Sequence, residues 1–141
     1  MSTTFIHTLV SNGERANLEC KRAQRNIPNS MWETYSAFAN TYGGTILLGI
    51  EENLQETDLA KRFSVVGVED AHKICADFWN IINSKEKVNC NILQDSDVQI
   101  IDVADKQIIK ISVPQASYSV RPIYINNNLT RGTFKRSHEG D

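Results

Sequence analysis

The chain has 141 residues and a net charge of −2, and 40% of its residues are hydrophobic and 23% charged. This length can bury one hydrophobic core, and the composition excludes a wholly disordered chain. The longest apolar runs are far shorter than the roughly 20 residues that cross a bilayer, so no transmembrane helix is predicted. The N-terminus has neither a basic region nor a long apolar stretch, so no signal peptide is predicted. Three widely spaced cysteines indicate neither a disulfide framework nor a zinc site and favour a cytoplasmic protein: Cys20, Cys75 and Cys90.

A strand and a helix are predicted in the first third of the chain. The residues around Leu18 and Cys20 alternate imperfectly between polar and apolar, which predicts a strand with these two side chains facing the core. Asn29 or Ser30 is the expected N-cap of the helix, and Glu33 completes a capping-box pattern with Ser30. Apolar residues at helical spacing predict one buried helix face: Met31, Tyr35, Phe38, Ala39 and Tyr42.

A glycine pair and a buried strand follow this helix. Gly43 and Gly44 can adopt the positive φ that ends a helix and turns the chain. Residues 45–50 are a continuous apolar run, as in a central strand that is covered on both faces. Glu51 and Glu52 follow where that strand leaves the sheet, so we expect a rigid scaffold to hold their charges.

The second half of the chain predicts another helix and several strands. Glu69 and Asp70 open a helix with an apolar face, and residues 98–103 and 107–113 predict a hairpin that Pro114 ends. Shorter extended segments and a turn are expected at 63–68, 122–125 and 126–128. This order of elements predicts an α+β domain with two main helices packed on a mixed β-sheet.

Basic residues gather at the two ends of the chain. Residues 1–26 and 115–141 each carry four basic and two acidic residues, whereas residues 51–105 carry 12 acidic and five basic ones. If the two ends meet, they form one basic surface. The candidate phosphate contacts are Arg15, Lys21, Arg22, Arg25, Arg131, Lys135 and Arg136. Three aromatic residues could stack on bases: Tyr118, Tyr124 and Phe134. The alternative is ordinary surface charge and core aromatics.

Three glutamates form a candidate metal site. Glu14 and Glu19 flank the first predicted strand and Glu51 follows the central one, so the three converge if these strands are neighbours. Carboxylate oxygens suit Mg²⁺ or Mn²⁺, and Lys21 would hold a phosphate beside the metal, as in metal-assisted phosphodiester cleavage. The alternative is that these are solvated surface acids paired with nearby bases.

Several segments of the chain resemble the Schlafen AlbA_2 domain. They are Glu14-x4-Glu19-x-Lys21, the Ala-Phe-Ala-Asn-Thr-x-Gly-Gly block at 37–44, and residues 46–52, 121–125, 132–136 and 139–141. The resemblance implies an AlbA-like domain at residues 13–141, preceded by a lead-in at 1–12. Within the Ala-Phe-Ala-Asn-Thr block, we expect Asn40 and Thr41 to bond loose backbone groups at the helix end, so the block is mainly structural.

The resemblance also implies two activities. Bacterial members are described as predicted DNA-binding transcriptional regulators, in which this domain is the N-terminal module, so further C-terminal domains are expected. Vertebrate Schlafens cleave transfer or ribosomal RNA with an acidic triad and a divalent metal, which would carry over onto Glu14, Glu19 and Glu51. The third position is usually an aspartate, whereas this chain has a glutamate there. Active Schlafens also build their groove from two lobes, so a single lobe is expected to bind without cutting unless it dimerises.

The first expectation is therefore a cytoplasmic module that binds nucleic acid, DNA or RNA, and needs no cofactor. The first alternative is a ribonuclease that requires Mg²⁺ or Mn²⁺ and uses Glu14, Glu19, Glu51 and Lys21 as catalytic residues. A second alternative is a protein-interaction or homo-oligomerisation module, which the negative net charge leaves open.

Overall fold

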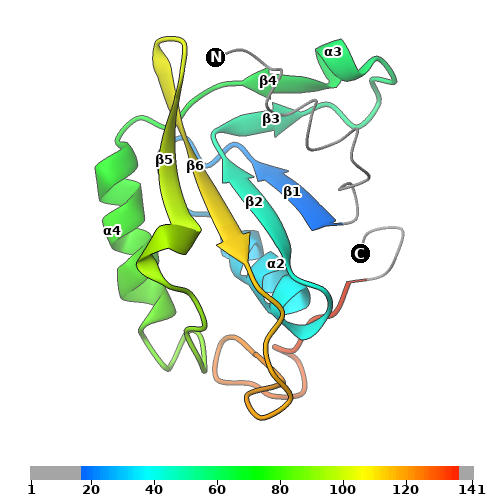
Figure 1. The fold of residues 1–141 in the computed structure, drawn as a ribbon, viewed down its shortest axis with the longest axis vertical. Helices are drawn as coiled ribbons and strands as arrows, with labels where there is room; N and C mark the ends of the chain where they lie inside the picture. The colour runs from blue at the N-terminus through cyan, green and yellow to red at the C-terminus, as the bar shows by residue number, and fades with distance from the viewer. Residues whose placement is uncertain (1–16, 137–141) are drawn as a thin grey trace.

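The structure, a computed structural model, describes residues 17–136. Its main sheet has four strands, in the spatial order β1 (Leu18–Lys21), β2 (Gly44–Leu48), β6 (Lys106–Val113) and β5 (Val98–Val103). β1 runs parallel to β2, and the other two pairings are antiparallel. The sheet is therefore mixed, as the sequence predicts (Figure 1).

Two main helices cover one face of this sheet. α2 (Asn29–Asn40) and α4 (Ala71–Ile82) bury their apolar side chains against alternate residues of β2 and β6, including Ile46, which is fully buried. Trp32 of α2 stacks on Phe78 of α4 with ring centroids 5.1 Å apart, which ties the two helices together. This layering confirms the predicted α+β class.

The two helices begin in different ways. Asp70 caps α4 as predicted, because its Oδ1 accepts a hydrogen bond of 3.1 Å from the backbone N–H three residues later. The predicted cap of α2 is wrong: the N-cap is Pro28, and no side chain bonds the first turn. Asn29 is already helical, so Ser30 lies inside the first turn, where it cannot form a capping box with Glu33.

A smaller layer covers the opposite face of the main sheet. β3 (Ile50–Glu52) and β4 (Phe63–Val65) pair antiparallel, and the short α3 (Leu59–Arg62) comes directly before β4. Apolar side chains of β3 and β4 form a second core with residues of the main sheet: Leu18, Leu47, Val103 and Ile108. β2 is thus buried on both faces, which confirms the prediction for the central strand.

The central apolar run forms two strands rather than one. Gly49 separates β2 from β3 with a φ of +98°, a conformation that glycine adopts without steric cost. A Cβ at this position would lie 3.1 Å from the Ile108 side chain and 3.3 Å from the backbone of Gly67. The prediction of one continuous strand is therefore wrong, and Glu51 lies in the small sheet, opposite Ser64.

The remaining elements are close to those predicted. β5 and β6 form the expected hairpin, whose turn includes Ala104 at a φ of 57°. Residues 66–68 lie outside β4, and residues 122–125 make only isolated bridges instead of a strand. Asn126 and Asn127 have φ values of 58° and 53°, which confirms the predicted turn. Among the helices in residues 17–136, none combines the length and the apolar character that a membrane span requires.

Candidate nucleic-acid interface

The first group of predicted site residues lies on the edge strand β1 and is held in ion pairs. Glu19 Oε2 lies 3.4 Å from Lys21 Nζ, and Glu19 Oε1 accepts a hydrogen bond of 3.1 Å from Arg136. The Arg136 guanidinium also lies over the ring of Phe38 on α2, 4.8 Å from its centroid, and only 6% of this arginine side chain is exposed. A carboxylate that the sequence proposes as a metal ligand is therefore balanced by two cations.

Glu51 has a basic partner of its own. Its Oε2 lies 3.9 Å from Arg22 Nη1, and both side chains are about half exposed. We call Glu19, Lys21, Arg22, Glu51 and Arg136 the β1 ion-pair cluster. Nearby pairs follow the same pattern, Arg25 with Glu69 and Arg62 with Glu52, each with 2.7 Å between nitrogen and oxygen. Four of the seven predicted phosphate contacts thus face carboxylates: Lys21, Arg22, Arg25 and Arg136.

The predicted metal site is only partly within the described residues. β1 and β2 are neighbours, as convergence of the glutamates requires, but β3 carries Glu51 into the small sheet. Glu14 and Arg15 lie outside the described residues. Between residues 17 and 136, no three His, Cys, Asp or Glu residues are grouped so that they could hold a metal ion.

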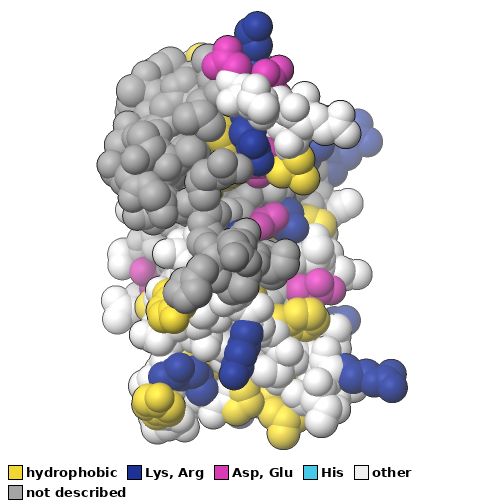
Figure 2. All heavy atoms as spheres, turned by 90° about the vertical axis from the view of Figure 1, so that its right-hand side faces the viewer, with side chains coloured by type: hydrophobic (Ala, Val, Ile, Leu, Met, Phe, Trp, Pro, Cys, Tyr) yellow, Lys and Arg dark blue, Asp and Glu magenta, His cyan; other side chains and the backbone are white. Residues whose placement is uncertain are grey.

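The second group of predicted residues lies on a loop that has bases without acids. Residues 114–135, which we call the basic loop, contain Arg121, Arg131 and Lys135 and no Asp or Glu. In the part of the chain that the structure describes, none of the three forms an ion pair. Arg131 and Lys135 are exposed. Figure 2 shows basic side chains interspersed with hydrophobic ones over the lower part of one face, the end where the loop lies in Figure 1.

The last turn of α2 holds the basic loop in place. The Asn40 amide donates to the carbonyls of Ile123 (2.8 Å) and Phe134 (3.0 Å), and its Oδ1 accepts from the Ile123 N–H (2.7 Å). Ser36 Oγ donates to the Ile123 carbonyl (2.7 Å) and accepts from the Phe134 N–H (3.0 Å). Asn40 and Ser36 are both buried. The expected role at the helix end holds for Thr41, whose hydroxyl donates to a carbonyl of its own helix, whereas Asn40 bonds a distant segment.

Comparison with known proteins decides the family. The profile of the Schlafen AlbA_2 family matches residues 14–141. The chain belongs to the Schlafen AlbA_2 family. The match spans β1, both main helices and the basic loop. Among curated proteins, no significant match was found.

Two solved structures are similar to this AlbA_2 domain. One is the solution NMR structure of the N-terminal domain of a Nitrosomonas europaea protein that is described as related to the ATP-dependent DNA helicase RecG. It is 28% identical, with a TM-score of 0.70, and the match covers 100% of this chain and 92% of that one. The other is a crystal structure of a Corynebacterium diphtheriae protein, at 16% identity and a TM-score of 0.49, which covers 79% of this chain and 19% of that one.

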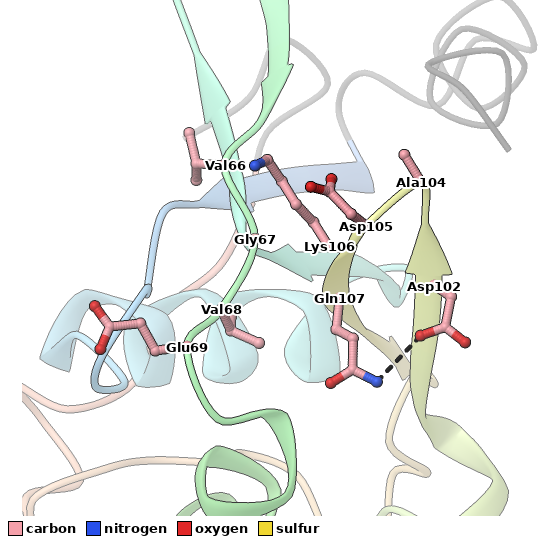
Figure 3. Close-up of a pocket in the computed structure, with 9 residues that line it drawn as sticks. All are labelled: Val66, Gly67, Val68, Glu69, Asp102, Ala104, Asp105, Lys106 and Gln107. Atoms are coloured by element: carbon pink, nitrogen blue, oxygen red, sulfur yellow. Dashed lines mark hydrogen bonds between the residues drawn. The ribbon is translucent and has the colours of Figure 1, made fainter.

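The AlbA_2 domain also has an acidic hollow at the end opposite the basic loop, beside the β5–β6 turn (Figures 1 and 3). Its volume is about 440 Å³, and its lining includes Glu69, Asp102 and Asp105 with the single cation Lys106. Gln107 Nε2 donates a hydrogen bond of 3.1 Å to Asp102. It contains none of the predicted site residues, and its charge disfavours a phosphate.

Two titratable groups of the AlbA_2 domain are held neutral by burial. Burial raises the pKa of the Cys20 thiol on β1, and the charges of Glu52 and Glu19 raise it further. A neutral thiol is a poor nucleophile, so Cys20 is unsuited to covalent catalysis. Burial raises the pKa of Tyr35 to about 12, and its hydroxyl donates to the Cys90 carbonyl at 2.9 Å. Both groups therefore serve packing.

One residue of the interface escaped the sequence analysis as a candidate. Arg121 lies in the basic loop with its guanidinium carbon 4.2 Å from the centroid of the Tyr118 ring. The sequence signal is the absence of acids from 114 to 135, together with an arginine three residues after a tyrosine. Glu139 and Asp141 follow this acid-free segment and partly offset its bases in the net charge of residues 115–141.

Proposed function

We propose that this chain is a nucleic-acid-binding module, with DNA as its first ligand, in a transcriptional regulator of several domains. The observation that carries the proposal is the basic loop, where Arg121, Arg131 and Lys135 have no acidic neighbours in sequence and no ion pairs among the described residues. Such cations neutralise phosphates whatever the base sequence. Family membership and the N-terminal domain of the RecG-related protein support a nucleic-acid-related role.

The negative net charge does not oppose this proposal. At physiological salt the Debye length is about 8 Å, so a phosphate responds to the charges beside it and not to the total for the chain. Each cation of the β1 ion-pair cluster faces a carboxylate, and the acidic hollow lies at the other end of the molecule. A phosphate backbone at the basic loop therefore meets positive charge.

The test measures how tightly the protein binds labelled duplex DNA, single-stranded DNA and transfer RNA. Fluorescence anisotropy reports the binding at a series of salt concentrations. Wild-type affinity is expected to fall steeply with salt. If the wild-type protein binds none of these nucleic acids at low salt, the proposal is contradicted. A stable oligomer under the same conditions would favour the protein-interaction alternative.

The variant for this test is Arg131→Gln/Lys135→Gln, which removes two exposed charges from the basic loop. It should lower the slope of log affinity against log salt by about 2, one unit for each phosphate contact. The matched control is Lys61→Gln/Lys106→Gln, which removes two exposed lysines on α3 and at the β5–β6 turn, at the opposite end of Figure 1. The control slope should equal that of the wild type.

A second candidate function, a metal-dependent ribonuclease, is favoured by the pairing of β1 with β2 and by the contact between Glu19 and Lys21. On this reading Glu14, Glu19 and Glu51 would hold Mg²⁺ or Mn²⁺, and Lys21 would hold the scissile phosphate. The test is incubation of labelled transfer RNA with Mn²⁺ or with chelator, beside Glu19→Gln. RNA fragments that appear only with the metal and are absent with the variant would support the ribonuclease function. RNA that is bound but remains intact would support the binding function alone.

A further inference from the structure

We propose that Tyr118, Arg121 and Lys135 form a subsite for one unpaired nucleotide, whose base stacks on Tyr118 and whose phosphate lies between the two cations. The inference rests on the proposed function and makes it specific, because it selects single-stranded nucleic acid over continuous duplex.

A tight turn brings the first two residues together. The backbone N–H groups of Val120 and Arg121 both donate to the Ser117 carbonyl, at 3.1 and 3.2 Å. Tyr118 and Arg121, three residues apart, therefore lie on one side of the turn, and the guanidinium carbon lies 4.2 Å from the ring centroid. This is a cation–π contact, and it fixes the orientation of the ring.

One face of the Tyr118 ring is accessible for stacking. Its side chain is 89% exposed, although one face of the ring lies against the Arg121 guanidinium. The opposite face must therefore be open to solvent. An exposed aromatic ring that a neighbouring arginine holds in place is the kind of platform on which single-strand-binding proteins stack bases.

Beside the ring is a hollow that can take the phosphate. Its volume is about 270 Å³, and its lining residues are Asn40, Tyr118, Arg121, Pro122 and Lys135. Arg121 Nε is buried and has no hydrogen-bond partner among the described residues. Because this Nε–H is closed off from solvent, the terminal N–H groups of the Arg121 guanidinium are the donors available to a phosphate oxygen in the hollow. Lys135 adds a second cation on the same hollow.

The end of α2 opposes an anion here, but weakly. A helix C-terminus carries the equivalent of about half a negative charge, and Asn40 is the last residue of α2. The carbonyl of Phe38 already accepts from the Thr41 and Gly43 N–H groups, at 3.2 and 2.7 Å, which reduces that charge. Two full positive charges on Arg121 and Lys135 outweigh it.

The combination of ring and cations specifies the form of the ligand. In a duplex, both faces of each internal base are covered by its neighbours, so the Tyr118 ring cannot stack there. An unpaired base exposes a face next to its own phosphate, which matches a ring next to two cations. The subsite therefore favours single strands, bulges or frayed ends.

The experiment compares two labelled probes with the full chain, a thymidine oligonucleotide of about 15 nucleotides and a duplex of the same length, a size suited to one such domain. Tyr118→Ala should weaken single-strand binding about fivefold or more, and duplex binding less than twofold. Tyr118→Phe, which keeps the ring, should bind like the wild type. Tyr42→Ala is the matched control, because Tyr42 is 63% exposed and does not line the hollow.

Each other outcome overturns the subsite. If Tyr118→Ala weakens both probes equally, or neither, while the wild-type protein still binds nucleic acid, the subsite is wrong and the proposed function stands. If the wild-type protein binds neither probe at low salt, both fail together. The melting temperature of Tyr118→Ala should match that of the wild type, because this side chain is almost fully exposed.

Discussion

The β1 ion-pair cluster and the basic loop contain similar numbers of cations but differ in what surrounds them. In the cluster, every base faces a carboxylate, and Arg136 is almost completely buried. In the loop, Arg121, Arg131 and Lys135 have no carboxylate partner among the described residues. A count of basic residues treats the two regions alike. Of these two regions, the loop is the one whose cations face no carboxylate among the described residues.

The two regions also differ in how they are supported. The cluster lies on a strand of the main sheet, whose register fixes its side chains. The loop contains no regular strand, and its position depends on side chains of α2, above all Asn40. The same comparison leads to four predictions.

The largest effect is expected from Asn40→Ala, which removes the support of the loop. Three hydrogen bonds to Ile123 and Phe134 are lost, two of them buried and one partly buried. We expect a loss of about 3 kcal/mol in the free energy of unfolding, because buried groups are left without partners. The melting temperature should fall by about 10 °C. Urea and thermal denaturation measure both, with exposed Asn53→Ala as a control that should lose less than about 1 kcal/mol. Equal losses in the two variants would show that the loop does not depend on Asn40.

The next effect concerns solvent access to the Cys20 thiol on β1. Burial raises the pKa of the Cys20 thiol, so the reactive thiolate should be scarce in the folded protein at pH 8. Alkylation by iodoacetamide should be more than tenfold slower at Cys20 in the native chain than in urea, since one pKa unit is a tenfold change in thiolate. Peptide mass spectrometry locates the modified cysteine. Rapid native alkylation would mean that the strand is open to solvent.

A direct comparison of the two regions comes from paired double variants. Arg131→Gln/Lys135→Gln should lower the affinity for labelled DNA about tenfold at moderate salt, because both cations are unpaired and each phosphate contact depends on salt. Lys21→Gln/Arg22→Gln removes the same charge from residues that already face carboxylates, so affinity should fall less than threefold. Anisotropy titrations measure both. A larger loss in the second variant would move the interface to β1.

The smallest effect is expected where an acid is removed. Glu51→Gln frees Arg22 from an exposed pair 3.9 Å long, which contributes little to stability. An unpaired Arg22 should raise the affinity for DNA about twofold at low salt, and the gain should vanish at high salt. Unchanged affinity would show that DNA does not reach this part of the molecule.

Much of the fold could be predicted from local sequence. Signals within a few residues predict the first main helix, the buried strand after it, the hairpin at 98–113 and the Asp70 cap. The predicted end of that helix is wrong, because α2 ends at Asn40 and leaves Tyr42 exposed beyond it. The break between β2 and β3 at Gly49 was harder to predict, because a single glycine in an apolar run does not indicate that the chain leaves one sheet for another. The reason is a close approach to Ile108 and Gly67, which are distant in sequence.

The candidate interface was less predictable, because its contacts join distant segments. Glu19 and Arg136 are 117 residues apart, and Asn40 and Ile123 are 83 apart. No short-range pattern shows that one cation is balanced and another is free to bind a phosphate. The sequence identified Arg131 and Lys135 as candidate contacts, but it could not separate them from Lys21 and Arg22, and it missed the pairing of Arg121 with Tyr118.

The hydrogen bonds that Asn40 makes to the basic loop determine how the loop can open. Asn40 and Ser36 each bond two segments of the loop, at Ile123 and Phe134, so both segments depend on the same two side chains. The loop should therefore open as a unit, and the amide protons of Ile123 and Phe134 should exchange with solvent at similar rates. By linkage, a ligand that binds the closed loop disfavours that opening, so occupancy at the surface is reported by these two amides.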